Sequence, residues 1–101
     1  MDWTSGYVTD LEYTHGYYRE LHPDILRLAC LNAGVAPPPG DKLTYLELGF
    51  GQGLSINIHA AANPGQYWGT DFNPSQAAHA SALAAASESG ARLFDESFAD
   101  F

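Results

Sequence analysis

Two short apolar runs, separated by a glycine turn and an alanine-rich segment, dominate the hydrophobic pattern of the chain. The first run, residues 43–48, is long enough for a buried strand and too short for a helix. The second run, residues 67–70, leads directly into Asp71. The turn after the first run contains three alternate glycines: Gly49, Gly51 and Gly53. We predict a strand at each run, with Asp71 at the end of the second strand.

The segment between the glycine turn and the second run has an ambiguous period. Its apolar residues alternate with polar ones, at Ser55, Asn57 and His59, and this period by itself indicates a strand. Three alanines follow, however, and two parallel strands need a crossover connection, which is usually helical. We therefore predict a helix over 54–62 that ends at the sequence Asn63-Pro64-Gly65.

The region before the first run predicts a helix followed by a stiff linker. Pro23 suits the first helical position, apolar residues recur at helical spacing over 23–33, and Gly34 is a good helix end. Three consecutive prolines follow, and they cannot join a central strand. We expect three parts: an aromatic arm and helix at 1–34, a linker at 35–41, and a nucleotide-binding portion at 42–101.

The region after Asp71 predicts a further helix and strand. Asn73 is a suitable N-cap, Pro74 suits the first helical position, and the alanine-rich stretch 75–89 ends at Gly90. Residues 91–94 indicate a third strand.

The order of these elements predicts an α/β protein with a Rossmann-like three-layer fold, of which the chain holds the N-terminal half. We expect about three parallel strands in the order 3-2-1 with flanking helices. A doubly wound sheet needs both halves to form its ligand crevice, and this chain reaches only a third strand, so we expect it to be the first part of a longer enzyme. The first strand would then have an unpaired edge, through which we expect self-association.

Composition and charge exclude several kinds of function. The chain has four Lys and Arg against twelve Asp and Glu, a formal net charge of −8, and its basic residues are scattered. This argues against a nucleic-acid surface or an anionic membrane as a partner. The single cysteine, Cys30, excludes an internal disulfide, and the four histidines have no metal-ligand spacing, so we expect no metal. We expect a cytoplasmic protein, since no secretory leader opens the chain.

The glycine turn and its flanking acids carry the candidate chemistry. Glycine lets the chain turn through positive φ and lets a ligand touch the backbone. The N–H groups of the following helix favour electron-rich ligand atoms, and Asp71 can accept both hydrogen bonds of a ribose diol. A dinucleotide fingerprint is G-x-G-x-x-G, whereas this turn reads Glu47-x-Gly49-x-Gly51-x-Gly53. Glu47 would repel a pyrophosphate and suits a ligand with a cationic amino acid end.

The sequence from Glu47 to Gly53, with Asp71 downstream, resembles class I S-adenosylmethionine-dependent methyltransferases over roughly residues 40 to 98. The resemblance implies that S-adenosylmethionine binds here and leaves as S-adenosylhomocysteine. By position it implies that Phe72 and Asn73 line the adenosine pocket, and that Ser97 and Phe98 meet the adenine. The sequence departs from the usual acid-then-small pair at Ser97, where an acidic surface loop is an equal alternative. A tight turn with no ligand is the alternative reading of the glycines.

The sequence from Tyr13 to Pro23 resembles the lead-in of bacterial methyltransferases that carry a regulatory domain further along the chain. In such enzymes this segment often folds over the cofactor. The resemblance implies that Tyr13, Tyr17 and Tyr18 can cover the methionine end of the cofactor or approach its methyl group. The alternative, which we weigh slightly higher for each tyrosine, is that they pack the arm onto the sheet.

The leading hypothesis is therefore the cofactor-binding portion of a methyltransferase that acts on an unidentified acceptor in a longer enzyme. No catalytic residue can be assigned, and the fragment is expected to be inactive alone. One alternative is an NAD- or flavin-dependent oxidoreductase, which the alternate glycines and Glu47 disfavour. Another is a non-catalytic interaction module that uses the exposed strand edge.

Overall fold

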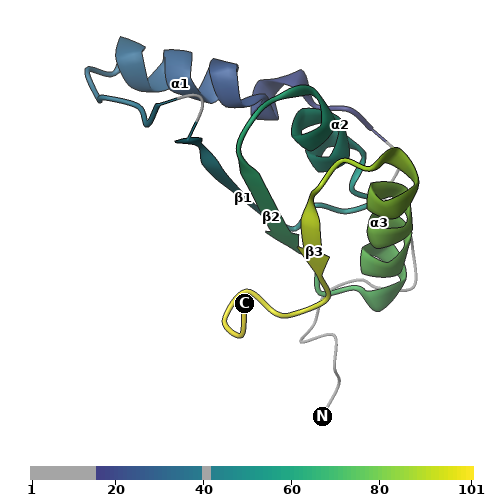
Figure 1. Ribbon diagram of the computed structural model, residues 1–101. Helices are drawn as coiled ribbons and strands as arrows, with labels where there is room; N and C mark the ends of the chain where they lie inside the picture. Colours follow the sequence, from purple (N-terminus) through teal and green to yellow (C-terminus); the bar gives the residue numbers. More distant parts are fainter. Residues whose placement is uncertain (1–15, 40–41) are drawn as a thin grey trace.

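A computed structural model describes residues 16–39 and 42–101 and confirms the predicted α/β fold (Figure 1). The elements in chain order are η1 (Arg19–Leu21), α1 (Pro23–Asn32), β1 (Thr44–Leu48), α2 (Leu54–Ala62), β2 (Gln66–Thr70), α3 (Pro74–Ser87) and β3 (Arg92–Phe94). The predicted site residue Tyr13, most of the predicted arm and the end of the predicted linker lie outside the described residues.

The sheet has the predicted parallel topology. Its order is β1-β2-β3, with Leu46 opposite Trp68 in one pair and Gly69 opposite Leu93 in the other. Among the described strands β1 therefore lies at an edge, as expected. Self-association through this edge stays a prediction.

The ambiguous segment 54–62 is a helix, as predicted, and its burial explains the ambiguity. Helices α2 and α3 lie against the same face of the sheet (Figure 1). The three polar side chains that alternate along α2, those of Ser55, Asn57 and His59, are buried, whereas Ile58 is exposed. The alternation therefore reflects polar side chains that are buried and hydrogen-bonded within the protein. It does not indicate the two-residue period of a strand.

The core is small and lies between α2, α3 and the sheet. It is formed by Tyr45, Phe50, Ile56, Tyr67, Ala77 and Ala80. The alanines of α3 allow close approach: a Cβ on Gly53 would lie 2.4 Å from the Cβ of Ala80. The crossing of α2 and α3 therefore requires small residues at both positions.

Helix α3 begins as predicted and ends earlier than predicted. The side chain of Asn73 accepts a hydrogen bond from the Ser75 amide (3.0 Å), and Pro74 is the first helical residue. The prediction that the helix runs to residue 89 is wrong, because Glu88 adopts a left-handed conformation (φ 54°) and ends the helix at Ser87. Gly90 also has positive φ, so the chain turns at both residues before β3.

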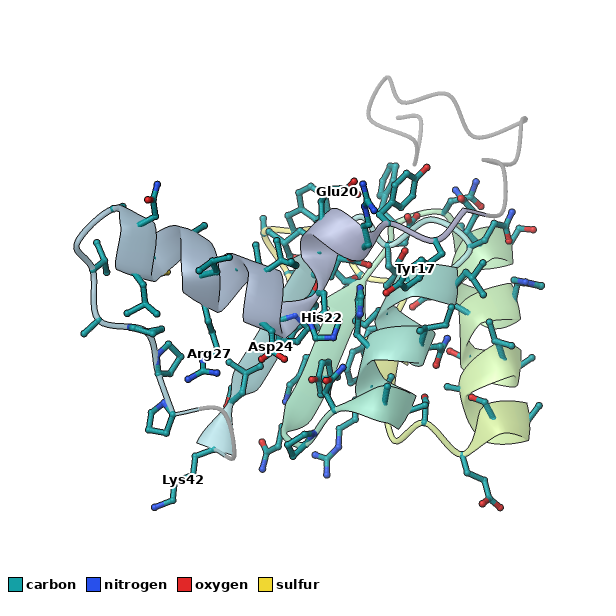
Figure 2. All side chains as sticks on the ribbon, turned by 90° about the horizontal axis from the view of Figure 1, so that it is seen from above. Tyr17, Glu20, His22, Asp24, Arg27 and Lys42 are labelled. Carbon is teal, nitrogen blue, oxygen red and sulfur yellow. The ribbon has the colours of Figure 1, made fainter. Side chains whose placement is uncertain are left out.

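Helix α1 begins at Pro23 as predicted, with the His22 side chain accepting from the Asp24 amide (3.0 Å). Figure 2 shows Asp24 and Arg27 on this helix, where their charged groups lie 3.6 Å apart. The apolar side chains of α1 remain largely exposed, with Leu28 at 62% and Leu31 at 61%. The predicted apolar face therefore exists in the sequence, but the described residues do not cover it.

Candidate functional site

The glycine turn forms a loop between β1 and α2 in which all three alternate glycines adopt positive φ. The φ values are +78° at Gly49, +63° at Gly51 and +80° at Gly53. Other residues rarely tolerate this region, so the glycines are required by the backbone path. The loop is anchored at its start, since the Gly49 amide donates to the Thr70 carbonyl (2.7 Å). The sequence pattern therefore corresponds to a defined loop at the carboxyl ends of β1 and β2.

Asp71 lies beside this loop with its carboxylate divided between two backbone amides. One oxygen, Oδ2, accepts from Gly51 at 2.8 Å, and the other, Oδ1, accepts from Asn73 at 3.0 Å. The residue is only 6% exposed. The structure thus brings together the acid and the glycine turn, although the predicted hydrogen bonds to a ribose would have to share oxygens that already accept from the protein.

A strap of residues 16–21 crosses the start of α2 and is held by two side chains of α2 that were not among the predicted site residues. The hydroxyl of Ser55 accepts from the Tyr18 amide (2.7 Å) and donates to the Gly16 carbonyl (3.3 Å). One turn along α2, the Nε2 of His59 lies 3.3 Å from the Tyr18 carbonyl. The one available signal was the i, i+4 spacing of Ser55 and His59, which places two polar groups on the same face of a helix.

His59 is fully buried, at 0% exposed. Its ring lies 5.3 Å from the rings of both Tyr17 and His22, which Figure 2 shows reaching toward α2. Burial lowers the pKa of His59, His22 lowers it further, and the Tyr18 carbonyl partly opposes them. Its Nδ1 has no hydrogen-bond partner among the described residues. His59 is therefore a buried histidine with one of its two ring nitrogens hydrogen-bonded among the described residues.

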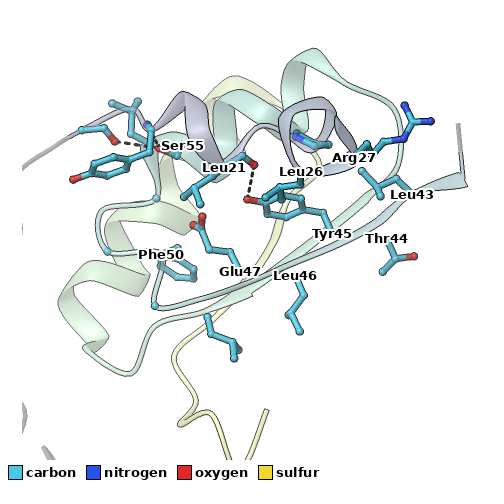
Figure 3. Close-up of a pocket in the computed structure, with 18 of the residues that line it drawn as sticks. Leu21, Leu26, Arg27, Leu43, Thr44, Tyr45, Leu46, Glu47, Phe50 and Ser55 are labelled. Carbon is cyan, nitrogen blue, oxygen red and sulfur yellow. Dashed lines mark hydrogen bonds between the residues drawn. The ribbon is translucent and has the colours of Figure 1, made fainter. Parts of the chain in front are cut away.

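A cavity of about 630 Å³ opens between β1, α1, the strap and the glycine loop (Figure 3). Its wall is largely apolar and includes Leu21, Leu26 and Leu43. Figure 3 shows Tyr45 and Glu47 pointing from β1 toward Leu21, while Leu46 points to the other side of the strand. The size is in the range of small-molecule sites, and the backbone of the glycine loop forms one end.

Glu47 is the acidic group in this cavity wall. Its Oε1 is buried and has no hydrogen-bond partner among residues 16–39 and 42–101. Burial raises the pKa of Glu47 from 4.5 to about 7, and the neighbouring Tyr45 hydroxyl acts in the opposite direction. The Tyr45 hydroxyl donates its hydrogen to the Leu21 carbonyl at 2.9 Å. A buried carboxyl oxygen without a donor favours a cationic or hydrogen-donating ligand group.

The predicted site residues divide into two groups around the loop. Glu47 and the three glycines line the cavity. The predicted adenosine residues lie at the carboxyl ends of β2 and β3, outside the cavity wall: Asp71, Phe72, Asn73, Ser97 and Phe98.

Besides Asp71, which bonds the Gly51 amide, Phe98 of the second group also approaches the loop. An added Cβ on Gly49 would lie 3.6 Å from its ring. The Ser97 hydroxyl donates to Asp100 (2.9 Å), and Asn73 is occupied in capping α3. The structure therefore brings Phe98 to the loop and turns the Ser97 hydroxyl toward the C-terminal turn.

In the part of the chain that the structure describes, no cluster of three or more His, Cys, Asp or Glu side chains could hold a metal ion. Among the same residues, no helix has the length and apolar character needed to cross a bilayer.

Comparisons with known proteins support the fold. No protein-family model matches the chain. An uncharacterized protein of Synechocystis sp., sll1526, is 39% identical over 104 residues, which include all of this chain and 21% of that protein. PKMT2 from Rickettsia typhi, solved in complex with AdoHcy, superimposes with a TM-score of 0.73 at 20% identity, covering 83% of this chain and 16% of that one. The chain thus spans about a fifth of its curated relative, and its fold is that of the matching part of PKMT2.

Proposed function

We propose that this chain is the S-adenosylmethionine-binding portion of a methyltransferase, and that the longer enzyme transfers the methyl group to an unidentified acceptor. The observation that carries the proposal is the buried, unpartnered Oε1 of Glu47 in a mostly apolar cavity beside the glycine loop. A carboxylate in low dielectric is stabilised strongly by an opposite charge, and the amino acid end of this cofactor carries an ammonium group.

Each part of the proposed site meets a different part of the cofactor. Glu47 would hold the amino group, directly or through water, and the loop glycines would let the cofactor approach the backbone. Asp71 would accept from the ribose hydroxyls, and Phe72, Asn73 and Phe98 would flank the adenosine. When bound, the cofactor supplies an electrophilic methyl group on a sulfonium, so the protein's task is to bind and orient it.

The likeness to an AdoHcy-bound neighbour supports this choice over a nicotinamide or flavin site. A dinucleotide would bring its pyrophosphate to the glycine loop, where the Glu47 carboxylate would repel it. The same carboxylate favours a cation. Glu47 therefore discriminates between the two cofactor classes by charge.

The test is a calorimetric titration of the 101-residue chain with S-adenosylhomocysteine, and separately with NAD, between pH 6 and 8. Because Glu47 must be ionised to attract the ammonium, and its pKa is about 7, affinity for S-adenosylhomocysteine should rise about tenfold over this range. Glu47→Gln should weaken binding at pH 8 and flatten the pH profile. Glu20→Gln, at an exposed acid, is the matched control and should retain the wild-type profile.

Three results would contradict the proposal. They are binding of NAD in preference to S-adenosylhomocysteine, an affinity that does not change with pH, and a Glu47→Gln variant that behaves as wild type.

A further inference from the structure

The glycine loop has little conformational preference of its own. Three of its five central residues are glycines with φ between +63° and +80°. Each glycine has access to many other conformations, so a loop of this composition needs outside contacts to keep one shape. Within the loop itself, the Gly53 amide donates to the Phe50 carbonyl (3.0 Å). The contacts that fix the rest must come from neighbouring elements.

The end of β2 supplies two such contacts. The Thr70 carbonyl accepts from Gly49 at 2.7 Å, and the Asp71 carboxylate accepts from Gly51 at 2.8 Å. Gly51 is the middle glycine, and a charge-assisted bond to a buried carboxylate is stronger than a neutral one. Asp71 is thus the side chain that holds the centre of the loop.

Asp71 is itself held in place from two sides. Its other oxygen accepts from Asn73 at 3.0 Å, just before α3 begins. Its own amide donates to the Phe94 carbonyl at 3.1 Å, at the end of β3. One carboxylate therefore ties the position of the loop to the ends of β2 and β3 and to the start of α3.

We infer that Asp71 is a positioning residue of the proposed cofactor site: through the Gly51 amide it holds the glycine loop in the shape that accepts the ligand. The inference rests on the proposed function for the identity of the ligand. It goes beyond the ribose contact, because it requires that most of the effect of Asp71 on ligand affinity persist when the ligand has no ribose hydroxyls.

The decisive experiment compares two ligands, S-adenosylhomocysteine and its 2′,3′-dideoxy analogue, on wild type and on Asp71→Asn. The amide of asparagine keeps the shape but removes the charge and one acceptor. We expect Asp71→Asn to weaken both ligands by a similar factor, about tenfold or more, the scale of a lost hydrogen bond to a charged group. A loss confined to S-adenosylhomocysteine would overturn the inference, because Asp71 would then act through the ribose alone.

Two control variants separate positioning from general destabilisation. Tyr67→Phe removes a hydrogen bond to the Pro64 carbonyl (3.3 Å) at the opposite end of β2, and Asp95→Asn makes the same charge change at an exposed site after β3. Measured well below their melting temperatures, both should bind as wild type. If Tyr67→Phe weakened binding to an extent that follows its loss of melting temperature, the loss of affinity in Asp71→Asn would reflect destabilisation alone. That result would overturn the inference.

A second measurement needs neither a ligand nor a variant. In the isotopically labelled wild-type chain, NMR should detect scalar coupling across the hydrogen bond between the Gly51 amide nitrogen and the Asp71 carboxyl carbon. Absence of this coupling while the Gly49 amide is protected would overturn the inference. If wild type binds neither ligand, the proposed function fails, and this coupling still decides whether Asp71 holds the loop.

Discussion

The two halves of this small fold treat similar apolar side chains in opposite ways. Around α2, β2 and α3, Ile56 and Ala80 are fully buried at 0% exposed, and Tyr67 is nearly so. On α1, Leu28 and Leu31 are more than 60% exposed, although their spacing is typical of a buried helical face. Apolar periodicity therefore identifies which residues can be buried, but whether they are buried depends on the elements packed against them.

Buried polar side chains also differ between the two halves, in whether their hydrogen-bonding groups have partners. Asn57 on α2 is buried and fully used: its amide donates to the carbonyls of Gly53 (2.9 Å) and Ala80 (3.2 Å) and accepts from the Ser89 hydroxyl (2.7 Å). Glu47 on β1 is buried at Oε1 without such partners. Buried polar groups are normally hydrogen-bonded, so an unpartnered carboxyl oxygen in a cavity wall supports the proposed ligand site more than the residue type alone does.

The largest effect should come from Ile56→Ala, which would test the packed half directly. Removing this fully buried side chain leaves a cavity and should lower the free energy of unfolding by about 2–5 kcal/mol. Leu31→Ala on α1 should change it by no more than about 0.5 kcal/mol. Urea denaturation followed by circular dichroism measures both. Comparable losses at the two sites would mean that α1 is packed in solution and that the contrast between the halves is wrong.

Gly53→Ala should have a similar or slightly smaller effect, for a different reason. The new Cβ would lie 2.4 Å from Ala80, in a residue with φ of +80°. Overpacking of about 1–3 kcal/mol would add to about 1 kcal/mol of backbone strain. Gly34→Ala is the matched control, since its φ is +78° but nothing lies within 4 Å. In thermal unfolding, Gly34→Ala should therefore lower the stability by the backbone strain alone. Equal losses of stability in Gly34→Ala and Gly53→Ala would exclude a close crossing of α2 and α3.

The pH dependence of stability should report on Glu47. Its pKa is raised on folding from 4.5 to about 7, so the contribution is fully present below pH 4.5 and is lost as pH rises through 7. The free energy of unfolding should fall by up to about 3 kcal/mol over that window. Glu47→Gln should remove this fall, while Glu20→Gln, at an exposed position, should retain it. A wild-type profile that stays flat from pH 5 to 8 would mean that water reaches the Glu47 carboxyl.

Much of the architecture could be predicted because it depends on local chemistry. Pro23, Pro74 and Asn73 mark helix starts, and alternate glycines before a helix indicate a turn through positive φ. The end of α3 was mispredicted because Glu88 takes a left-handed conformation that glycine usually occupies. The left-handed conformation at Glu88 depends on the path that the chain takes to β3, and this path cannot be inferred from the local sequence pattern.

The candidate site divides in the same way. The sequence alone determined that three glycines and an acid on the next strand would meet, because parallel topology places both at one end of the sheet. Only the tertiary structure decided that Asp71 bonds Gly51, that Ser55 and His59 hold Tyr18, and that Oε1 of Glu47 remains without a partner. These outcomes depend on groups 20 or more residues away, whose approach is set by packing and by the burial of their neighbours.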